Sequence, residues 1–185
     1  MEPQEENKKE NFLKEIVKFT LIALAIVVPI RLYVAQPFIV HGASMDPTFA
    51  TGQYLIVDQL TYHLNDPKRE DVIVLRYPKN PSTFFIKRII GLPGETVSME
   101  EGQVTIINKE SPQGFTLADS YVSESRKTKQ NFKISLGPTE YFVMGDNRKE
   151  SSDSREWGPL EEKYIVGRPL VRLYPISKMQ FFPGQ

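Results

Sequence analysis

The stretch from residue 71 to residue 91, DVIVLRYPKNPSTFFIKRIIG, indicates the fold most directly. It contains two runs rich in β-branched and aromatic residues, DVIVLRYP and TFFIKRIIG, and prolines lie between them. Runs of this composition and length, bounded by turn residues, are typical of β-strands. We therefore predict two short strands joined by a turn.

The same pattern of short strands continues on both sides. Similar runs are QYLIVDQL (53–60), ETVSM (95–99), QVTIIN (103–108), EYFVMGD (140–146) and IVGRPLVRLYP (165–175). The step Glu100-Glu101-Gly102 is expected to form a hairpin turn. No run after residue 40 has sustained helical periodicity, and the polar stretch 109–130 is expected to be a surface loop. The sequence therefore predicts a mainly β fold, an antiparallel sheet or barrel-like domain, without a second domain.

The N-terminal part of the chain differs from the rest. Residues 1–18 are polar and charged, whereas residues 19–30, FTLIALAIVVPI, carry no charge. Three interpretations are open: a removed signal peptide, a buried soluble helix and a transmembrane anchor. The anchor is favoured, because a helix over residues 16–35 would span ~30 Å, about one hydrocarbon core. The lysines that precede it then predict a cytoplasmic tail, residues 1–15, and an external domain, residues 36–185.

Composition excludes several classes of protein. The chain has 23 basic and 23 acidic residues, so no net charge favours a nucleic-acid partner. It has no cysteine, which excludes disulfides, thiolate nucleophiles and cysteine-ligated zinc. It has only two histidines, His41 and His63, so we do not expect a histidine-rich metal site.

The segment HGASMDPT, residues 41–48, is the first candidate for chemistry. It places Ser44 just before a proline turn. On its own this serine is equally well interpreted as an ordinary turn residue. We do not expect His41 to be its base, because the two lie only three residues apart on an extended segment without a carboxylate neighbour.

Lys87 is the second candidate, because it lies inside the apolar run FFIKRIIG, residues 84–91. Strand alternation puts Lys87 and Arg88 on opposite faces, each between apolar neighbours. One interpretation is an edge strand protected by charges. The other is a desolvated lysine with a lowered pKa. At an ordinary pKa near 10.4, only ~1 lysine in 2,500 is neutral at pH 7, so a lysine base requires apolar surroundings.

The third candidate is the run GDNRKESSDSR, residues 145–155, which follows a predicted strand. It is not a calcium loop, because Arg148 stands at the third ligand position, where an oxygen is required. It is interpreted either as a solvated polar loop or as a scaffold. In a scaffold, Asp–Arg pairs fix the backbone and a serine hydroxyl orients a neighbouring group.

Together these segments resemble the signature boxes of bacterial type I signal peptidases (leader peptidases) of the compact, single-anchor form. The resemblance is carried, in order, by Ser44-Met45 with Pro47-Thr48, by Lys87-Arg88 with Gly91-Leu92-Pro93-Gly94, by residues 145–155, and by Val166-Gly167-Arg168 through Tyr174-Pro175. It covers essentially the whole chain. It implies a membrane-bound serine endopeptidase that removes N-terminal signal peptides from translocated preproteins and needs no metal or organic cofactor.

The resemblance also implies a role for each matching residue. Ser44 is the expected nucleophile and Lys87 the expected general base. The expected supporting residues are Ser151, which orients the lysine, Asp146 paired with Arg88, Asp153 paired with Arg155, and Met45 beneath the nucleophile. Some members place an oxyanion-hole serine two residues before the nucleophile, where this chain has Gly42. Either another hydrogen-bond donor takes the place of that serine, or the oxyanion is stabilised less strongly. Alternatively, the glycine allows the substrate backbone to approach more closely.

The family would place this chain in the cytoplasmic membrane, with its catalytic domain on the outer face, close to the bilayer and the secretion translocon. Larger members carry an extra β subdomain, of which little or none is expected in residues 109–130. Two alternatives remain: a non-catalytic, membrane-tethered β module that binds extended peptides, and a self-cleaving Ser–Lys repressor domain. The predicted span and the absence of a DNA-binding helix pair in the sequence argue against the repressor.

Overall fold

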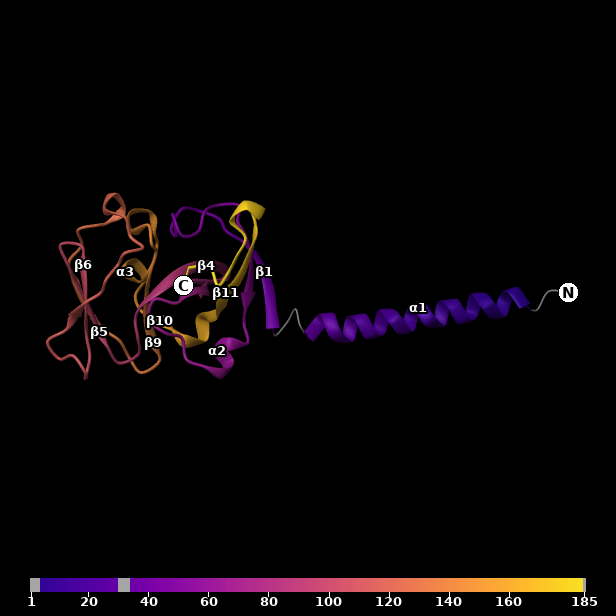
Figure 1. The fold of residues 1–185 in the computed structure, drawn as a ribbon. Helices are drawn as coiled ribbons and strands as arrows, with labels where there is room; N and C mark the ends of the chain where they lie inside the picture. Colours follow the sequence, from indigo (N-terminus) through magenta and orange to yellow (C-terminus); the bar gives the residue numbers. More distant parts are fainter. Residues whose placement is uncertain (1–3, 30–33, 185) are drawn as a thin grey trace.

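The computed structural model describes residues 4–29 and 34–184 of the chain. The first of these ranges is one helix, α1 (Gln4–Pro29), which projects away from the β-strands (Figure 1). Within the described ranges, no helix is both long enough and apolar enough to qualify as a membrane span. Residues 1–3 of the predicted tail and residues 30–33 of the predicted anchor lie outside the described residues.

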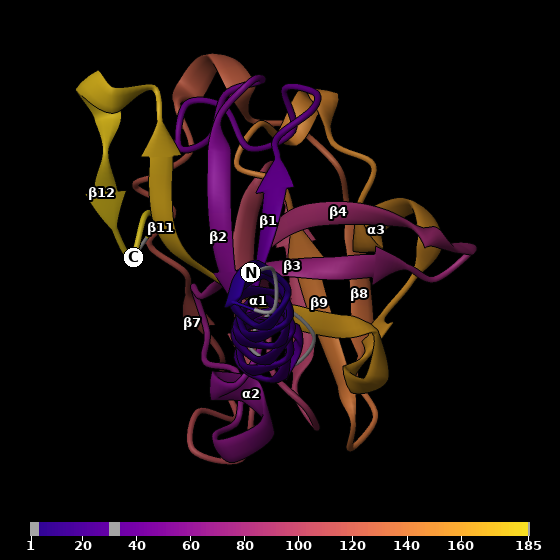
Figure 2. The same ribbon diagram turned by 90° about the vertical axis from the view of Figure 1, so that its right-hand side faces the viewer.

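An eight-stranded antiparallel sheet forms the larger part of the fold, as the sequence predicted. Its strand order is β1-β2-β11-β3-β4-β9-β10, and β12 pairs with β11. The strands are β1 (Ala35–Ile39), β2 (Tyr54–Asp58), β3 (Val72–Tyr77), β4 (Asn80–Gly91), β9 (Glu140–Met144), β10 (Leu160–Glu161), β11 (Ile165–Tyr174) and β12 (Gln180–Phe181). In the view down α1, β1 and β2 lie beside β3 and β4 (Figure 2).

A second antiparallel sheet has four strands in the order β7-β6-β5-β8. They are β5 (Thr96–Glu100), β6 (Gln103–Ile107), β7 (Phe115–Thr116) and β8 (Phe132–Ser135). The predicted hairpin is confirmed, since Glu100 pairs with Gln103. Glu101 and Gly102 both have positive φ, as a tight two-residue hairpin turn requires. The sequence predicted this hairpin but not the two outer strands.

The two sheets share an apolar core. One buried cluster joins Ile90 of β4 and Met144 of β9 to Val97, Met99 and Ile106 of the smaller sheet. Each fully buried apolar side chain of this kind contributes roughly 1.5–3 kcal/mol relative to exposure. The second sheet is thus packed onto the first.

Strand β4 lies inside the larger sheet and not at its edge. It pairs with β3 on one side and with β9 on the other. The interpretation of Lys87 as a charge that protects an edge strand is therefore wrong, because β4 has a partner strand on each side and this lysine is only 3% exposed. Both neighbours are buried strands, so a charged side chain in β4 needs a specific reason to be there.

The sequence did not predict the short helices of the chain. They are α2 (Thr61–Leu64), α3 (Ser154–Trp157), η2 (Glu124–Arg126), η3 (Arg148–Glu150), η4 (Glu162–Tyr164) and η5 (Ile176–Lys178). Each is about one turn long, which is too short for an apolar period to appear. Helix α3 begins after Asp153, whose side chain accepts a hydrogen bond from the backbone N–H of Arg155.

Candidate active site

Ser44 lies in the turn that connects β1 to β2. Backbone hydrogen bonds close this turn, from Asp46 N–H to the Ala43 carbonyl (3.1 Å) and from Phe49 N–H to the Met45 carbonyl (2.8 Å). The side chain of Met45 is buried in an apolar cluster with Val40, Phe49, Leu55 and Val72. The turn is therefore anchored from the core side, while Ser44 itself is half-buried.

Lys87 reaches Ser44 from the middle of β4. Its Nζ donates hydrogen bonds to Ser44 Oγ (2.8 Å) and to the Ile86 carbonyl (2.9 Å). The ammonium also lies 5.0 Å from the centroid of the Phe85 ring. Lys87 is only 3% exposed. The fold thus joins two residues 43 positions apart into a serine–lysine pair that excludes most solvent.

Burial lowers the pKa of Lys87 to about 8. The neighbouring charges act in both directions: Asp153 raises this pKa, Arg155 lowers it and Asp146 raises it. Desolvation is the largest of these effects, because removal from water disfavours the charged form. With a pKa near 8, ~1 lysine in 10 is neutral at pH 7, compared with ~1 in 2,500 for an unperturbed lysine.

Arg88 points to the opposite face of β4 and forms a buried ion pair with Asp146. Its Nε and Nη2 donate to the two carboxylate oxygens at 2.9 and 2.7 Å. Thr48 donates to the same carboxylate at 2.5 Å. Arg88 Nη1 donates to the carbonyls of Glu70 and Gly184, both at 2.8 Å. The pair therefore ties β4 to the Ser44 turn and to the start of the 145–155 loop.

Asp153 and Arg155 form a second buried pair within that loop. Arg155 donates to both carboxylate oxygens of Asp153, each at 2.8 Å. The same carboxylate accepts a hydrogen bond from Gly145 N–H (3.0 Å). Asn147 N–H donates to the Ser44 carbonyl at 3.0 Å. The loop is consequently a scaffold that closes onto the Ser44 turn, and the interpretation as a solvated loop is wrong.

Ser151 is buried in the same loop, yet its hydroxyl has no hydrogen-bond partner within the described part of the chain. The expected hydrogen bond to Lys87 is not present in this structure, where Lys87 donates to Ser44 and Ile86. A Cβ on Gly145 would collide with Ser151 Oγ and with the Ser44 carbonyl. Gly145 is thus the position that lets the loop approach Ser44, and this role was not predicted from the sequence.

Gly42 has a φ of +88°, which side chains other than glycine rarely adopt. A Cβ at this position would meet no atom within 4 Å. The glycine therefore faces open space, and the backbone conformation is what favours it. Across the described residues, the N–H of Ser44 donates to no backbone carbonyl.

A small apolar groove of about 110 Å³ leads to the serine–lysine pair. The groove is lined by Phe38, Ile39, Val40, His41, Ser44, Leu55, Val74, Phe84, Phe85, Ile86 and Lys87. His41 is exposed there. The described residues hold no cluster of His, Cys, Asp and Glu side chains arranged for a metal ion.

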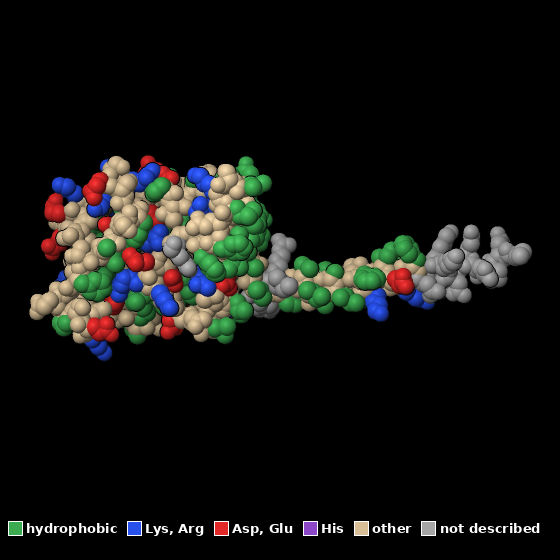
Figure 3. Space-filling model, in the orientation of Figure 1, with side chains coloured by type: hydrophobic (Ala, Val, Ile, Leu, Met, Phe, Trp, Pro, Cys, Tyr) green, Lys and Arg blue, Asp and Glu red, His purple; other side chains and the backbone are tan. Residues whose placement is uncertain are grey.

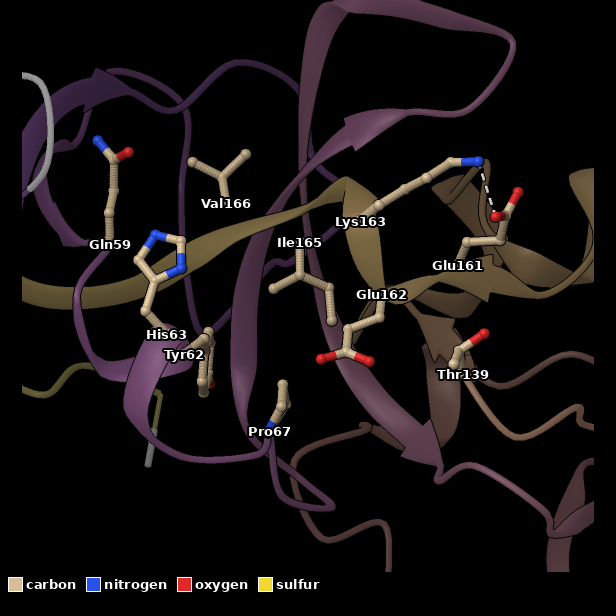
Figure 4. Close-up of a pocket in the computed structure, with 10 residues that line it drawn as sticks. All are labelled: Gln59, Tyr62, His63, Pro67, Thr139, Glu161, Glu162, Lys163, Ile165 and Val166. Atoms are coloured by element: carbon tan, nitrogen blue, oxygen red, sulfur yellow. Dashed lines mark ion pairs between the residues drawn. The ribbon is translucent and has the colours of Figure 1, made fainter.

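A larger hollow of about 500 Å³ lies elsewhere and contains neither Ser44 nor Lys87 (Figure 4). It is lined by Gln59, Tyr62, His63, Pro67, Thr139, Glu161, Glu162, Lys163, Ile165 and Val166. Its ion pair, between Lys163 and Glu161 (2.7 Å), is exposed and close in the sequence. The residues that line this hollow do not pair a nucleophile with a base. The candidate active site is therefore the smaller groove, which contains Ser44 and Lys87.

A serine hydroxyl that contacts a buried lysine of lowered pKa, in an antiparallel β fold, defines the class of Ser–Lys hydrolases. Residues 13–174 match the family described as "Signal peptidase, peptidase S26", and the chain belongs to this family.

Two relatives in sequence agree with this assignment. The chain is 32% identical to signal peptidase I of Bacillus licheniformis, over 97% of this chain and 98% of the relative. It is 33% identical to signal peptidase I T of Bacillus subtilis (strain 168), over 94% and 91% of the two chains. A crystal structure of a signal peptidase I from Enterococcus faecalis V583 is 31% identical, with a TM-score of 0.47, and covers 56% of this chain and 97% of that one.

The predicted resemblance is thereby confirmed. The activity is that of signal peptidase I, a serine endopeptidase that removes signal peptides, and its substrates are preproteins. The family is anchored to membranes. The alternatives of a non-catalytic peptide-binding module and of a repressor domain are wrong.

Proposed function

We propose that Ser44 is the nucleophile of this peptidase and that Lys87 is its general base. Neutral Lys87 accepts the Ser44 proton while Oγ attacks the scissile carbonyl, and the resulting ammonium protonates the leaving amine. Water then releases the acyl group by the same proton transfers in reverse. The observation that carries the proposal is the 2.8 Å contact between Nζ and Oγ at a lysine that is 3% exposed.

The backbone N–H of Ser44 is proposed as the donor that stabilises the oxyanion. Support comes from the turn itself, because this N–H is not used by any backbone carbonyl of the described residues. Donors fixed in advance at the position where charge develops contribute strongly to acyl transfer. The open space at Gly42 is where a substrate backbone or a second donor would lie.

The supporting residues are proposed to hold this geometry. The Arg88–Asp146 and Asp153–Arg155 pairs fix β4 and the 145–155 loop against the Ser44 turn. Ser151 is proposed to orient Lys87, since its buried hydroxyl has no hydrogen-bond partner among the described residues and the lysine ammonium has a third N–H donor beyond the two in use.

The groove supports a substrate with small side chains near the scissile bond. A volume of about 110 Å³ lined by apolar side chains accepts alanine-sized residues and refuses bulky ones. Strand β1 is the last strand of its sheet, so its outer edge is open to pairing with an extended peptide. We propose that a preprotein with small residues at positions −3 and −1 binds there as an added strand.

We further propose that residues 1–15 are a cytoplasmic tail, residues 16–35 a single-pass anchor and residues 36–185 an external peptidase domain near the translocon. The apolar side chains of α1 are exposed, Phe19 by 72%. Hydrophobic side chains also gather at the end of the β-domain from which α1 projects (Figure 3). Exposed members at β1, β11 and β12 are Ile39, Leu173, Tyr174 and Phe181. These surfaces suit contact with a bilayer.

The pH dependence of kcat/KM tests the proposed base. The lowered pKa of Lys87, about 8, means that protonation inactivates the base as the pH falls through this value. We expect kcat/KM for a peptide substrate to rise about tenfold per pH unit below the pKa and to level off above it. The rise should persist in a His41→Gln variant. A profile that is flat from pH 6 to 9 would contradict the role of Lys87.

Protease accessibility tests the proposed topology. We expect a protease added outside intact cells, freed of their wall, to degrade residues 36–185 while a cytoplasmic marker protein survives. The reason is that lysines before an apolar span retain that side in the cytoplasm. The measurement is an immunoblot against a C-terminal tag. Protection of the tag until the cells are lysed would show that the domain is cytoplasmic.

A further inference from the structure

The segment from Leu117 to Gln130, which connects β7 to β8, is fixed to the fold at its base. Leu117 is buried in the core of the smaller sheet, and its N–H donates to the Val104 carbonyl at 2.8 Å. Val122 is buried as well. The segment is polar overall, and the sequence suggested only a surface loop. Its buried residues instead hold it in one place beside the active site.

The 117–130 segment contacts both arginines of the scaffold. The Tyr121 ring lies over the Arg88 guanidinium, with 4.1 Å between the guanidinium carbon and the ring centroid. Thr128 Oγ1 and Gln130 Oε1 accept hydrogen bonds from Arg155 Nη1 at 2.9 and 3.0 Å. This one segment therefore contacts the Arg88 guanidinium through an aromatic ring and the Arg155 guanidinium through two hydrogen bonds.

Arg126, in η2, connects the segment to the turn of the nucleophile. Its Nη2 forms an ion pair with Asp46 Oδ2. Asp46 follows Ser44 by two residues, and its N–H closes the turn onto the Ala43 carbonyl. The carboxylate is thus held from the 117–130 segment while the backbone of the same residue shapes the serine turn.

We propose that the 117–130 segment is a clamp that positions Ser44 for attack, and that Arg126 is its positioning residue, acting through Asp46. The inference rests on the proposed role of Ser44. A displacement of a reacting atom by about 1 Å is enough to reduce a rate by up to about a hundredfold. Met45 holds the serine turn from the core side, and the Arg126–Asp46 ion pair restrains its outer side.

The solvent exposure of the Arg126–Asp46 ion pair allows an effect on the position of Ser44 to be told apart from an effect on folding. The side chains of Arg126 and Asp46 are 29% and 34% exposed. Ion pairs with this degree of exposure contribute little to the stability of a fold, since water and salt screen them. A loss of activity in a variant of this pair would therefore report on geometry and not on unfolding.

Steady-state kinetics of the full-length protein on a purified preprotein test the clamp. In Arg126→Ala we expect kcat to fall about tenfold, with KM within about twofold of the original value. The melting temperature should change by no more than about 2 °C. Arg126→Lys keeps the charge and should recover part of the lost kcat. Lys129→Ala is the matched control, because it removes a cation of the same segment, paired with exposed Glu101, and should leave kcat unchanged.

A comparison of single and double variants tests whether Arg126 acts through Asp46. Asp46→Ala should lower kcat as Arg126→Ala does, and the combination should be no worse than either change alone, because both remove one interaction. An unchanged kcat in Arg126→Ala, additive losses, an effect on KM alone, or an equal loss in Lys129→Ala would overturn the clamp. Failure of the Ser44 mechanism is distinguishable, because it appears as an active Ser44→Ala variant.

Discussion

Ser44→Ala is expected to abolish cleavage of a preprotein, with a loss of about 10³-fold or more in kcat/KM. The change removes only Oγ, the atom that contacts Lys87 Nζ at 2.8 Å and that we propose attacks the substrate. The groove and the scaffold remain, so substrate binding should be retained. The measurement is the appearance of mature product on a gel, followed until slow residual cleavage is quantified.

The matched control for this experiment is Ser152→Ala. Ser152 is exposed and donates a hydrogen bond to Glu156 at 2.6 Å, away from the serine–lysine pair. Its loss should leave cleavage within about twofold of normal, because exposed substitutions usually have small effects. Cleavage at the normal rate by the Ser44→Ala protein would rule out Ser44 as the nucleophile.

Lys87→Arg is the second change with a very large expected effect. Arginine keeps the positive charge and donates hydrogen bonds, but its pKa above ~12 prevents it from becoming neutral at working pH. The burial that makes lysine a base by lowering its pKa to about 8 cannot do the same for a guanidinium. We expect a loss of about 10³-fold or more, and it should not recover as the pH is raised to 9.

A measurement of folding and two control variants keep this result interpretable. A buried arginine is harder to accommodate than a lysine that can neutralise itself, so the folded fraction must be measured by circular dichroism. Lys87→Met removes the charge altogether, and we expect it to be folded and inactive. Lys163→Arg, at an exposed lysine paired with Glu161, should be fully active. A folded Lys87→Arg protein with a tenth or more of normal activity would exclude the lysine as the base.

Strands whose residues alternate between apolar and polar, or form a continuous apolar run, could be predicted from the sequence. The shortest strands and helices could not. All seven strand segments proposed from the sequence are present. Strand β1 was missed because its residues continue the apolar run of the N-terminal segment. Strands β7, β10 and β12 have two residues each, which is too short for a periodic signal. Their existence depends on pairing partners distant in the sequence.

In the candidate site, too, features that depend on nearby residues were predicted from the sequence, whereas contacts between distant segments were not. The motifs placed Ser44, Lys87 and the two Asp–Arg pairs in one scheme, and the fold brings these groups together. The contribution of residues 117–130 was not predictable, because Arg126 meets Asp46 across 80 positions of the chain. The crowding at Gly145 was hidden as well, since it depends on how closely one loop approaches another.

Lys87 and Arg88 are consecutive residues of β4 that serve opposite faces of the sheet, one toward Ser44 and the other toward Asp146. A shift of this strand by one residue would move each cation to the opposite face, because successive side chains alternate between faces. In one direction the permanently charged guanidinium of Arg88 would take the place of the lysine beside Ser44, and in the other direction the apolar Ile86 would take that place. An insertion or deletion of one residue within β4 ahead of Lys87 would thus remove the proposed base from Ser44 even if the sheet still formed. We therefore expect changes of length to be tolerated better in the turns of this chain than in the strand that carries both cations.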